Sequence, residues 1–166
     1  MSQIFNWSLL TGFDFFISYK RSEAGSYARR LEELLRAADF RCFLDDNDAA
    51  AGDPLSIRIK SALKRSKVLI LIASPNVGSS DWVAEEVRIF SARKGSIIPI
   101  NIGGGLQRAL QSDPRFRPLG VRDVRWLEEA TKADMLAEPS PQILGELQKN
   151  SGIDALTGIY GSSLRW

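Results

Sequence analysis

The stretch FDFFISYKRS (residues 13–22) runs from apolar residues directly into a tyrosine and two cations. Three more apolar runs follow along the chain: FRCFL (40–44), KVLILIA (67–73) and SIIPINI (96–102). They are continuously apolar rather than alternating, which is typical of strands buried on both faces of a sheet. A weaker run, VRDVRWL (121–127), predicts one further strand.

Helical patterns separate these predicted strands. Ser22 is a suitable N-cap, and after it apolar residues recur at intervals of three and four through residue 38. Pro54 suits the first turn of a second helix, a third begins near SSDW (79–82), and PQILGELQK (141–149) predicts the last. Strands that alternate with helices imply a parallel sheet covered on both faces. We therefore predict an α/β domain with three layers, in which helices flank a central parallel sheet of about five strands.

The composition favours one soluble globular domain. A chain of 166 residues, 44% of them hydrophobic, is long enough to bury a core without disulfides or metals. Its 22 Lys and Arg residues are balanced by 20 Asp and Glu residues, so the net charge is only +2. This balance gives no basis for general nucleic-acid binding, and we expect no nucleic acid among the partners.

The cysteine and histidine contents exclude several kinds of site. Cys42 is the only cysteine, which excludes an internal disulfide and favours a reducing, cytoplasmic location. The chain has no histidine, which excludes a Ser-His-Asp triad and a histidine-based zinc site, so we expect no metal. The first residues do not resemble a secretion signal, and no apolar run is long enough to span a bilayer. A membrane connection would therefore need a further region after GSSLRW (161–166).

Polar side chains follow the first predicted strand. Tyr19, Lys20 and Arg21 leave it at its carboxyl end, where ligands gather in open parallel sheets. The strand would then carry a polar cluster into a binding crevice. The alternative that these residues leave open is that Tyr19 caps the core while the two cations lie in solvent.

The predicted third helix directs one of two adjacent glutamates toward the protein. Val83, Val87 and Phe90 define its apolar face. At about 100° per residue, Glu86 lies roughly 50° from the centre of that face and Glu85 roughly 150° from it. A buried carboxyl group is costly unless it is paired, shifted in pKa or used in chemistry. Two structural alternatives stay open: an ion pair with a cation of the first loop, or a boundary position from which the side chain turns to water.

Other segments bear on ligand binding. Trp82 lies one turn before Glu86 on the same stripe of the predicted helix. LDDNDAAAGD (44–53) is an acidic loop, in which Asp45 follows the second strand directly and is the member best placed to reach the site. GGG (103–105) lacks the other residues of a P-loop or of a dinucleotide-binding fingerprint, so we interpret it as a flexible turn.

Several of these segments resemble motifs of the Toll/interleukin-1 receptor (TIR) domain family. DFFISYKRS (14–22) resembles the family's first-strand motif, and SSDWVAEEV (79–87) resembles its Trp-x-x-x-Glu signature. LIASPN (71–76) resembles the usual end of the third strand. The acidic loop falls where the family has its long loop after the second strand.

The resemblance covers about residues 13–150. It implies a flavodoxin-like fold for this region, with an N-terminal extension over residues 1–12 and a C-terminal tail or linker over residues 151–166.

The TIR family contains two functional types. One type is an assembly module that gathers other TIR domains, and the other is an NAD hydrolase, also found among bacterial immune effectors. The enzymes are similar to this chain in having the signature glutamate, here Glu86, and an aromatic and basic cluster after the first strand, here Tyr19, Lys20 and Arg21. The resemblance implies a bacterial-type NAD+ glycohydrolase that self-associates through TIR domains in a defence or cell-death response. The alternative is a non-catalytic TIR scaffold in signalling.

The candidate residues suit cleavage of the nicotinamide–ribose bond. The reaction releases a neutral base from a cationic ring, so the leaving group needs no general acid. One carboxylate is then enough to stabilise an oxocarbenium-like ribose. NAD+ would be the substrate, with no cofactor, and the product would be ADP-ribose or a cyclic isomer of it. We expect Glu86 to be catalytic and the following residues to bind substrate: Tyr19, Lys20, Arg21, Asp45 and Trp82.

Overall fold

The computed structural model describes residues 12–45, 54–121, 124–129 and 138–150. The predicted N-terminal extension and C-terminal tail therefore lie almost wholly outside the described residues, as does most of the acidic loop. Strands and helices alternate along the described chain in the order β1 (Phe13–Tyr19), α2 (Arg21–Ala37), β2 (Cys42–Leu44), α3 (Ile57–Arg65), β3 (Ser66–Ala73), a short 3₁₀ helix η1 (Val77–Ser79), α4 (Asp81–Ala92), β4 (Ser96–Ile102), α5 (Gly105–Ser112), a second 3₁₀ helix η2 (Pro114–Gly120), β5 (Leu127–Glu129) and α6 (Pro141–Asn150).

The five described strands form one parallel sheet in the order β2-β1-β3-β4-β5. β1 is paired on both sides: Phe15 lies opposite Cys42 of β2 and opposite Val68 of β3. This strand order is that of the flavodoxin-like doubly wound fold, which confirms the predicted fold class.

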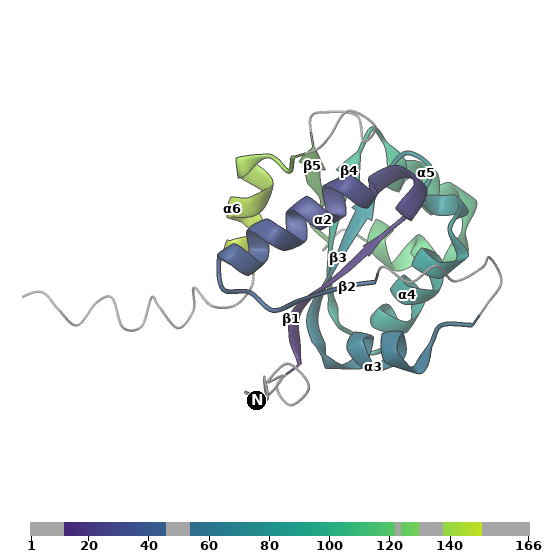
Figure 1. Ribbon diagram of the computed structural model, residues 1–166. Helices are drawn as coiled ribbons and strands as arrows, with labels where there is room; N and C mark the ends of the chain where they lie inside the picture. Colours follow the sequence, from purple (N-terminus) through teal and green to yellow (C-terminus); the bar gives the residue numbers. More distant parts are fainter. Residues whose placement is uncertain (1–11, 46–53, 122–123, 130–137, 151–166) are drawn as a thin grey trace, which may run out of the picture.

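Helices cover both faces of the sheet, and each face has its own core (Figure 1). Phe15 and Ile17 of β1 point to the face covered by α2 and α6, whereas Phe16 points to the face covered by α3, α4 and α5. Because side chains alternate along a strand, a continuously apolar sequence is what a sheet covered on both sides requires. No helix in the described ranges combines the length and hydrophobicity needed to cross a bilayer.

Two predicted helix starts are wrong. α2 begins at Arg21 with Lys20 as the N-cap, not at Ser22, because the Lys20 carbonyl already accepts hydrogen bonds from the amides of Glu23 and Ala24. The helix is kinked at Ala24, where φ is −123° and ψ is 16°.

Pro54, predicted in the first turn of the second helix, precedes that helix. α3 begins at Ile57, because the Ser56 hydroxyl accepts a hydrogen bond from the Ile59 amide and caps the helix there.

The fifth strand is displaced toward the C-terminus of its predicted range. β5 covers Leu127–Glu129 rather than residues 121–127, and Val121 is 56% exposed. The buried Glu129 carboxylate accepts hydrogen bonds from the Tyr27 hydroxyl at 2.7 Å and from the Ser140 amide at 3.1 Å. Contacts with α2 and with the start of α6 thus hold this strand in place, and its own apolar pattern does not indicate them.

The glycine run is a turn, as predicted, but it also starts a helix that we did not predict. Gly103 and Gly104 have positive φ values of 56° and 75°, and Gly104 is the N-cap of α5. Gly105 packs so closely on the end of β3 that a Cβ atom there would lie 2.1 Å from the Ser74 carbonyl oxygen. The position of α5 therefore depends on glycine chemistry at this turn.

Candidate active site

A pocket of about 270 Å³ opens at the carboxyl edge of the sheet. The end of β1, the start of α2, the end of β2 and the start of α4 contribute to it. The pocket brings together all five predicted substrate-binding residues with two serines: Tyr19, Lys20, Arg21, Ser22, Asp45, Ser80 and Trp82.

The end of β2 is held by residues that leave β1. The Tyr19 hydroxyl and the Arg21 guanidinium each donate a hydrogen bond to the backbone carbonyl of Asp45 at 3.2 Å. The Asp45 carboxylate lies 3.7 Å from the same guanidinium. Tyr19 is 7% exposed and belongs to the core, so it caps the core and lines the pocket at once. The predicted approach of Asp45 to the cluster after β1 is confirmed.

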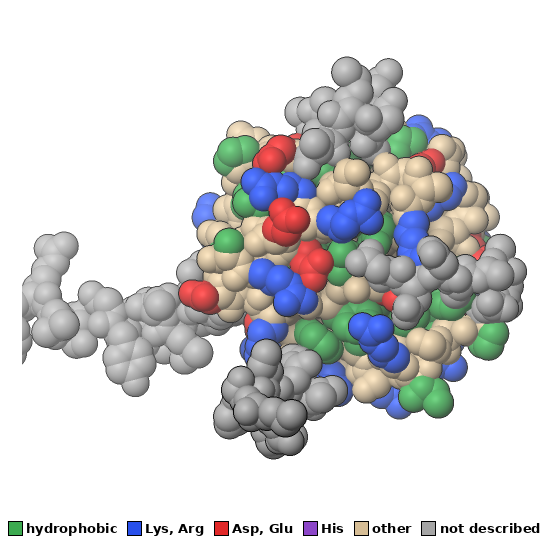
Figure 2. Space-filling view, in the orientation of Figure 1, with side chains coloured by type: hydrophobic (Ala, Val, Ile, Leu, Met, Phe, Trp, Pro, Cys, Tyr) green, Lys and Arg blue, Asp and Glu red, His purple; other side chains and the backbone are tan. Residues whose placement is uncertain are grey.

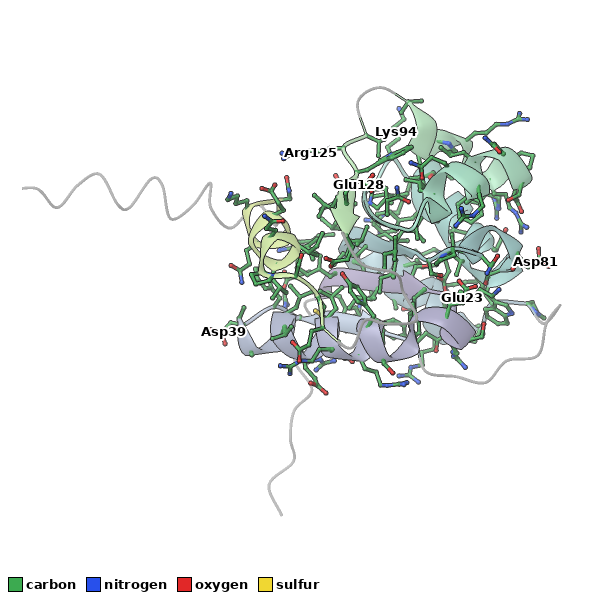
Figure 3. All side chains as sticks on the ribbon, turned by 90° about the horizontal axis from the view of Figure 1, so that it is seen from above. Glu23, Asp39, Asp81, Lys94, Arg125 and Glu128 are labelled. Atoms are coloured by element: carbon green, nitrogen blue, oxygen red, sulfur yellow. The ribbon has the colours of Figure 1, made fainter. Side chains whose placement is uncertain are left out.

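A hydrogen-bond network ties the loop after β1 to the loop after β3. The Lys20 ammonium donates to the Ser79 hydroxyl at 2.9 Å and lies 3.9 Å from the Glu23 carboxylate. Glu23 accepts hydrogen bonds from the Asn76 backbone amide at 3.0 Å and from the Asn76 side-chain amide. Glu23 lies in the first turn of α2, at the end opposite Asp39 (Figure 3). Lys20, Asn76 and Ser79 each lie in one of the motifs quoted above, but a motif does not indicate which side chains contact one another, so this network was not predicted.

The start of α4 places its two glutamates as the helical periodicity predicts. The Ser80 hydroxyl accepts a hydrogen bond from the Val83 amide and caps the helix. Glu86 is 5% exposed. Glu85 is partly exposed, and its carboxylate lies 2.6 Å from the Arg88 guanidinium. The interpretation that only Glu86 faces the protein is therefore confirmed.

The Glu86 carboxyl group is paired with a neutral hydroxyl. The Ser18 hydroxyl of β1 donates a hydrogen bond of 2.5 Å to Glu86 Oε2 and is the only hydrogen-bond partner of this carboxyl among the described residues. Neither structural alternative holds. The Glu86 side chain is buried rather than turned to water, and among the described residues it forms no ion pair with a cation that follows β1. Ser18 was missed, although a small hydroxyl residue after the apolar run Phe15–Ile17 of β1 was a visible signal.

The surroundings of Glu86 favour its protonated form. Burial raises the pKa of Glu86 to about 8 from an ordinary 4.5, and the negative charge of Asp45 also raises it. The hydrogen bond from Ser18 and the positive charge of Arg21 oppose this rise. At pH 7 the group is therefore largely neutral, and a nearby cation would favour its ionisation.

Glu86 does not line the pocket itself. Tyr19, which follows Ser18 in β1, and Trp82, one turn before Glu86 on α4, both do. Trp82 also lines a second pocket of about 340 Å³, together with Lys60 and Arg115. Glu86 is thus a neighbour in the chain of pocket-lining elements without lining the pocket, and Trp82 lines both pockets.

An open parallel sheet with polar side chains gathered at its carboxyl edge is the ligand-binding arrangement of doubly wound α/β domains. Within that class, this chain belongs to the TIR domain family, because the TIR domain model matches residues 15–136. The resemblance inferred from the sequence is confirmed.

Curated relatives carry enzymatic names. "NAD(+) hydrolase ApTIR" from Actinoplanes sp. is 30% identical over 168 residues, which covers 93% of this chain and 19% of the relative. "Probable 2' cyclic ADP-D-ribose synthase BdTIR" from Brachypodium distachyon is 36% identical over 73 residues, 44% of this chain and 33% of the relative. "NAD(+) hydrolase tir-1" from Caenorhabditis elegans is 32% identical over 95 residues, 52% of this chain and 10% of the relative. The chain thus spans a tenth to a third of the length of these relatives.

Solved structures agree on the fold. The TIR domain of the Toll-related receptor TRR-2 from Hydra magnipapillata gives a TM-score of 0.53 at 16% identity, over 86% of this chain and 97% of that one. A TIR-STING receptor from C. gigas gives 0.51 at 24% identity, over 70% of this chain and 34% of that one. At these identities the likeness concerns the fold alone.

Proposed function

We propose that this domain hydrolyses NAD+ at the nicotinamide–ribose bond and releases nicotinamide with ADP-ribose or a cyclic isomer. The observation that carries the proposal is the buried Glu86 carboxyl, held by a neutral hydroxyl next to a pocket that contains two cations and a tryptophan. The enzymatic names of the curated relatives support the same activity.

The main contribution that this reaction requires of the protein is electrostatic stabilisation of the positive charge on the ribose. As the glycosidic bond breaks, its electron pair goes to the nicotinamide nitrogen, and positive charge moves onto the ribose. An ionised Glu86 opposes that charge and accepts hydrogen bonds from the ribose hydroxyls. The oxygen of water or of a hydroxyl of the same molecule then bonds to the ribose carbon, its proton is released to solvent, and the linear or the cyclic product results.

The pocket residues would serve different parts of such a substrate. Lys20 and Arg21 supply positive charge for the diphosphate, and Trp82 offers a flat face for ring stacking. The Tyr19 hydroxyl, which donates a hydrogen bond to the Asp45 carbonyl at the pocket wall, holds the end of β2 in place. No cofactor enters this mechanism.

The cationic nicotinamide ring is itself able to activate Glu86. A positive charge close to a buried carboxyl favours its ionised form, so substrate binding would lower the pKa of Glu86 below about 8. At pH 7 the carboxylate would then form mainly when there is a positive charge to stabilise.

Glu86 lies outside the lining of the pocket, and this favours a second candidate function, a non-catalytic TIR scaffold. Both candidates use self-association, which we propose as part of the function, in a cytoplasmic defence or cell-death response. A solved structure with the same fold, the TIR domains of the activated Roq1 resistosome, supports assembly of TIR domains in that protein. The buried, unpaired Cys42 is consistent with a reducing location.

The deciding experiment is nicotinamide release from NAD+ by the purified chain at high concentration. We expect Glu86→Ala to reduce release by at least about 100-fold, because it removes the main electrostatic group. Glu85→Ala, one residue away on the exposed side of α4, is the matched control and should keep activity near that of the wild type. Equal losses from both variants would contradict the role of Glu86. No release by the wild type under any condition would favour the scaffold.

A further inference from the structure

The hydrogen bond between Ser18 and Glu86 links two elements that are far apart in the chain. Ser18 lies in β1 and Glu86 in α4, and 68 positions separate them. Ser18 is 1% exposed and Glu86 is 5% exposed, so water contributes little at either group. The contact fixes one carboxyl oxygen, Oε2, at a distance of 2.5 Å from the hydroxyl oxygen.

A neutral hydrogen-bond donor stabilises the Glu86 carboxylate without cancelling its negative charge, as a cation would. An arginine or lysine paired with Glu86 would favour ionisation, but its own charge would cancel the field that the carboxylate exerts on a cationic ribose. A hydroxyl favours the ionised form through one hydrogen bond and leaves the negative charge uncompensated. It also leaves the second oxygen, Oε1, without a hydrogen bond to any described residue.

We propose that Ser18 is a positioning residue for the NAD+ hydrolysis proposed above. Its hydroxyl orients the Glu86 carboxyl so that Oε1 faces the substrate ribose, and it assists ionisation of the group. The inference rests on the proposed function, but the contact between the two side chains can be measured independently of it.

The other charged groups near Glu86 do not replace Ser18. Asp45, at the end of β2, disfavours ionisation of Glu86, and Arg21, at the start of α2, favours it through space. The Arg21 guanidinium is engaged with Asp45, and the Lys20 ammonium is directed to Ser79 and Glu23. Ser18 is thus the one described group that favours the carboxylate by direct contact.

The test uses two variants and one control. Ser18→Ala removes the donor, Ser18→Thr retains it, and Ser66→Ala is the control. Ser66 is also 1% exposed and on the sheet, and its hydroxyl donates to the Ala62 carbonyl, well away from Glu86. Nicotinamide release is measured as kcat and KM from pH 6 to pH 10, with far-UV circular dichroism to verify folding. If Ser18→Ala does not fold, Ser18→Cys takes its place, because a thiol is a much weaker donor.

For Ser18→Ala we expect kcat to fall about tenfold with little change in KM. We also expect the low-pH limb of the kcat/KM profile to move to higher pH, because the lost hydrogen bond had favoured the ionised form. Ser18→Thr should restore most of the activity, and Ser66→Ala should match the wild type. A profile for Ser18→Ala that coincides with that of Ser66→Ala, in an active enzyme, would overturn the positioning role.

A second readout separates this inference from the proposed function. Titration of the Glu86 side-chain carbon by NMR, in wild type and in Ser18→Ala, measures the pKa without any substrate. A higher pKa in the variant supports the coupling, and an unchanged pKa overturns it, whether or not the chain cleaves NAD+. If the wild type releases no nicotinamide while the titration shifts, the proposed function and the catalytic part of this inference fail, and the structural coupling stands.

Discussion

At the scale of single residues, Glu86 combines burial with a pKa raised to about 8. The folded protein therefore keeps a proton on this group at pH values between 4.5 and 8, where the unfolded chain has lost it. Stability linked to Glu86 is fully present below pH 4.5 and is lost as the pH rises through about 8. The sequence retains a residue that destabilises the fold at neutral and alkaline pH, which is the pattern expected of a functional group.

A stability measurement tests this assignment without substrate. Glu86→Gln cannot ionise, so its free energy of unfolding relative to the wild type should increase between pH 5 and pH 9. The size follows from about 1.4 kcal/mol for each pKa unit, and a gain of several kcal/mol is expected at pH 9. Glu85→Gln should show no such trend, because Glu85 is partly exposed and paired with Arg88. Urea unfolding at a series of pH values provides the data, and parallel curves for Glu86→Gln and wild type would contradict a raised pKa.

The same titration should govern catalysis. Only the ionised form of Glu86 stabilises a cationic ribose, so kcat/KM of the wild type should rise with pH and level off above an apparent pKa near 8. The parameter kcat should level off at lower pH, because the bound nicotinamide cation favours ionisation. Initial rates of nicotinamide release from pH 6 to pH 10 measure both profiles. A kcat/KM that is flat or falls over this range would count against a carboxylate in the catalytic role.

Residue-level prediction from the sequence succeeded where a regular period was available. The angular positions of Glu85 and Glu86 on a helix follow from 3.6 residues per turn, and burial in the structure agrees with them. Ser18 could not be assigned as the partner of Glu86 in the same way, because a period indicates a face and not the side chain that packs against it. The only indication in the sequence was that Ser18 is a hydroxyl residue after the apolar run Phe15–Ile17.

At the scale of elements, the turns at the carboxyl edge set the arrangement of the loops. Gly105 begins α5 in contact with the end of β3, where a Cβ atom would lie 2.1 Å from the Ser74 carbonyl oxygen and 2.3 Å from that of Ala73. Such contacts cannot be relieved by a rotamer change, because both neighbouring atoms belong to the backbone.

We expect Gly105→Ala to destabilise the domain by more than about 2 kcal/mol. Gly145→Ala is the matched control: residue 145 lies inside α6 and a Cβ atom there would meet nothing within 4 Å. That change should stabilise the domain by up to about 1 kcal/mol, because alanine favours the helix. Thermal unfolding of both variants measures the difference. Similar melting temperatures for the two would show that α5 moves away from β3 at little cost.

Element boundaries were harder to predict than elements. The extents of β4 and α6 agree with their apolar patterns within one residue. The start of α2 at Arg21 depends on hydrogen bonds that the Lys20 carbonyl accepts. The shift of β5 to Leu127–Glu129 depends on the hydrogen bond that the Glu129 carboxylate accepts from the Tyr27 hydroxyl. The second of these contacts joins residues about a hundred positions apart, and no local pattern contains it.

At the scale of the whole molecule, the surface charges of the described residues do not form a patch of one sign that would attract a charged ligand to one place on the face shown. Acidic and basic side chains are interspersed on the face shown in Figure 2. The candidate pocket, at about 270 Å³, is smaller than the roughly 300–1,000 Å³ usual for sites that enclose small molecules and cofactors. A dinucleotide would therefore extend beyond it, past Trp82 or onto the surface of another molecule.

Self-association could be what extends the pocket that the described residues form, and this leads to a concentration test. If a second copy completes the pocket, the rate of nicotinamide release per molecule should rise with protein concentration, by about tenfold or more from low micromolar to high micromolar, because assembly increases the active fraction. A crowding agent should shift the same curve to lower protein concentration. Glu86→Ala, measured over the same range, corrects for background cleavage, and light scattering at each concentration reports assembly directly. A rate per molecule that stays constant while scattering shows assembly would mean that each domain carries a complete site, and that association serves another purpose.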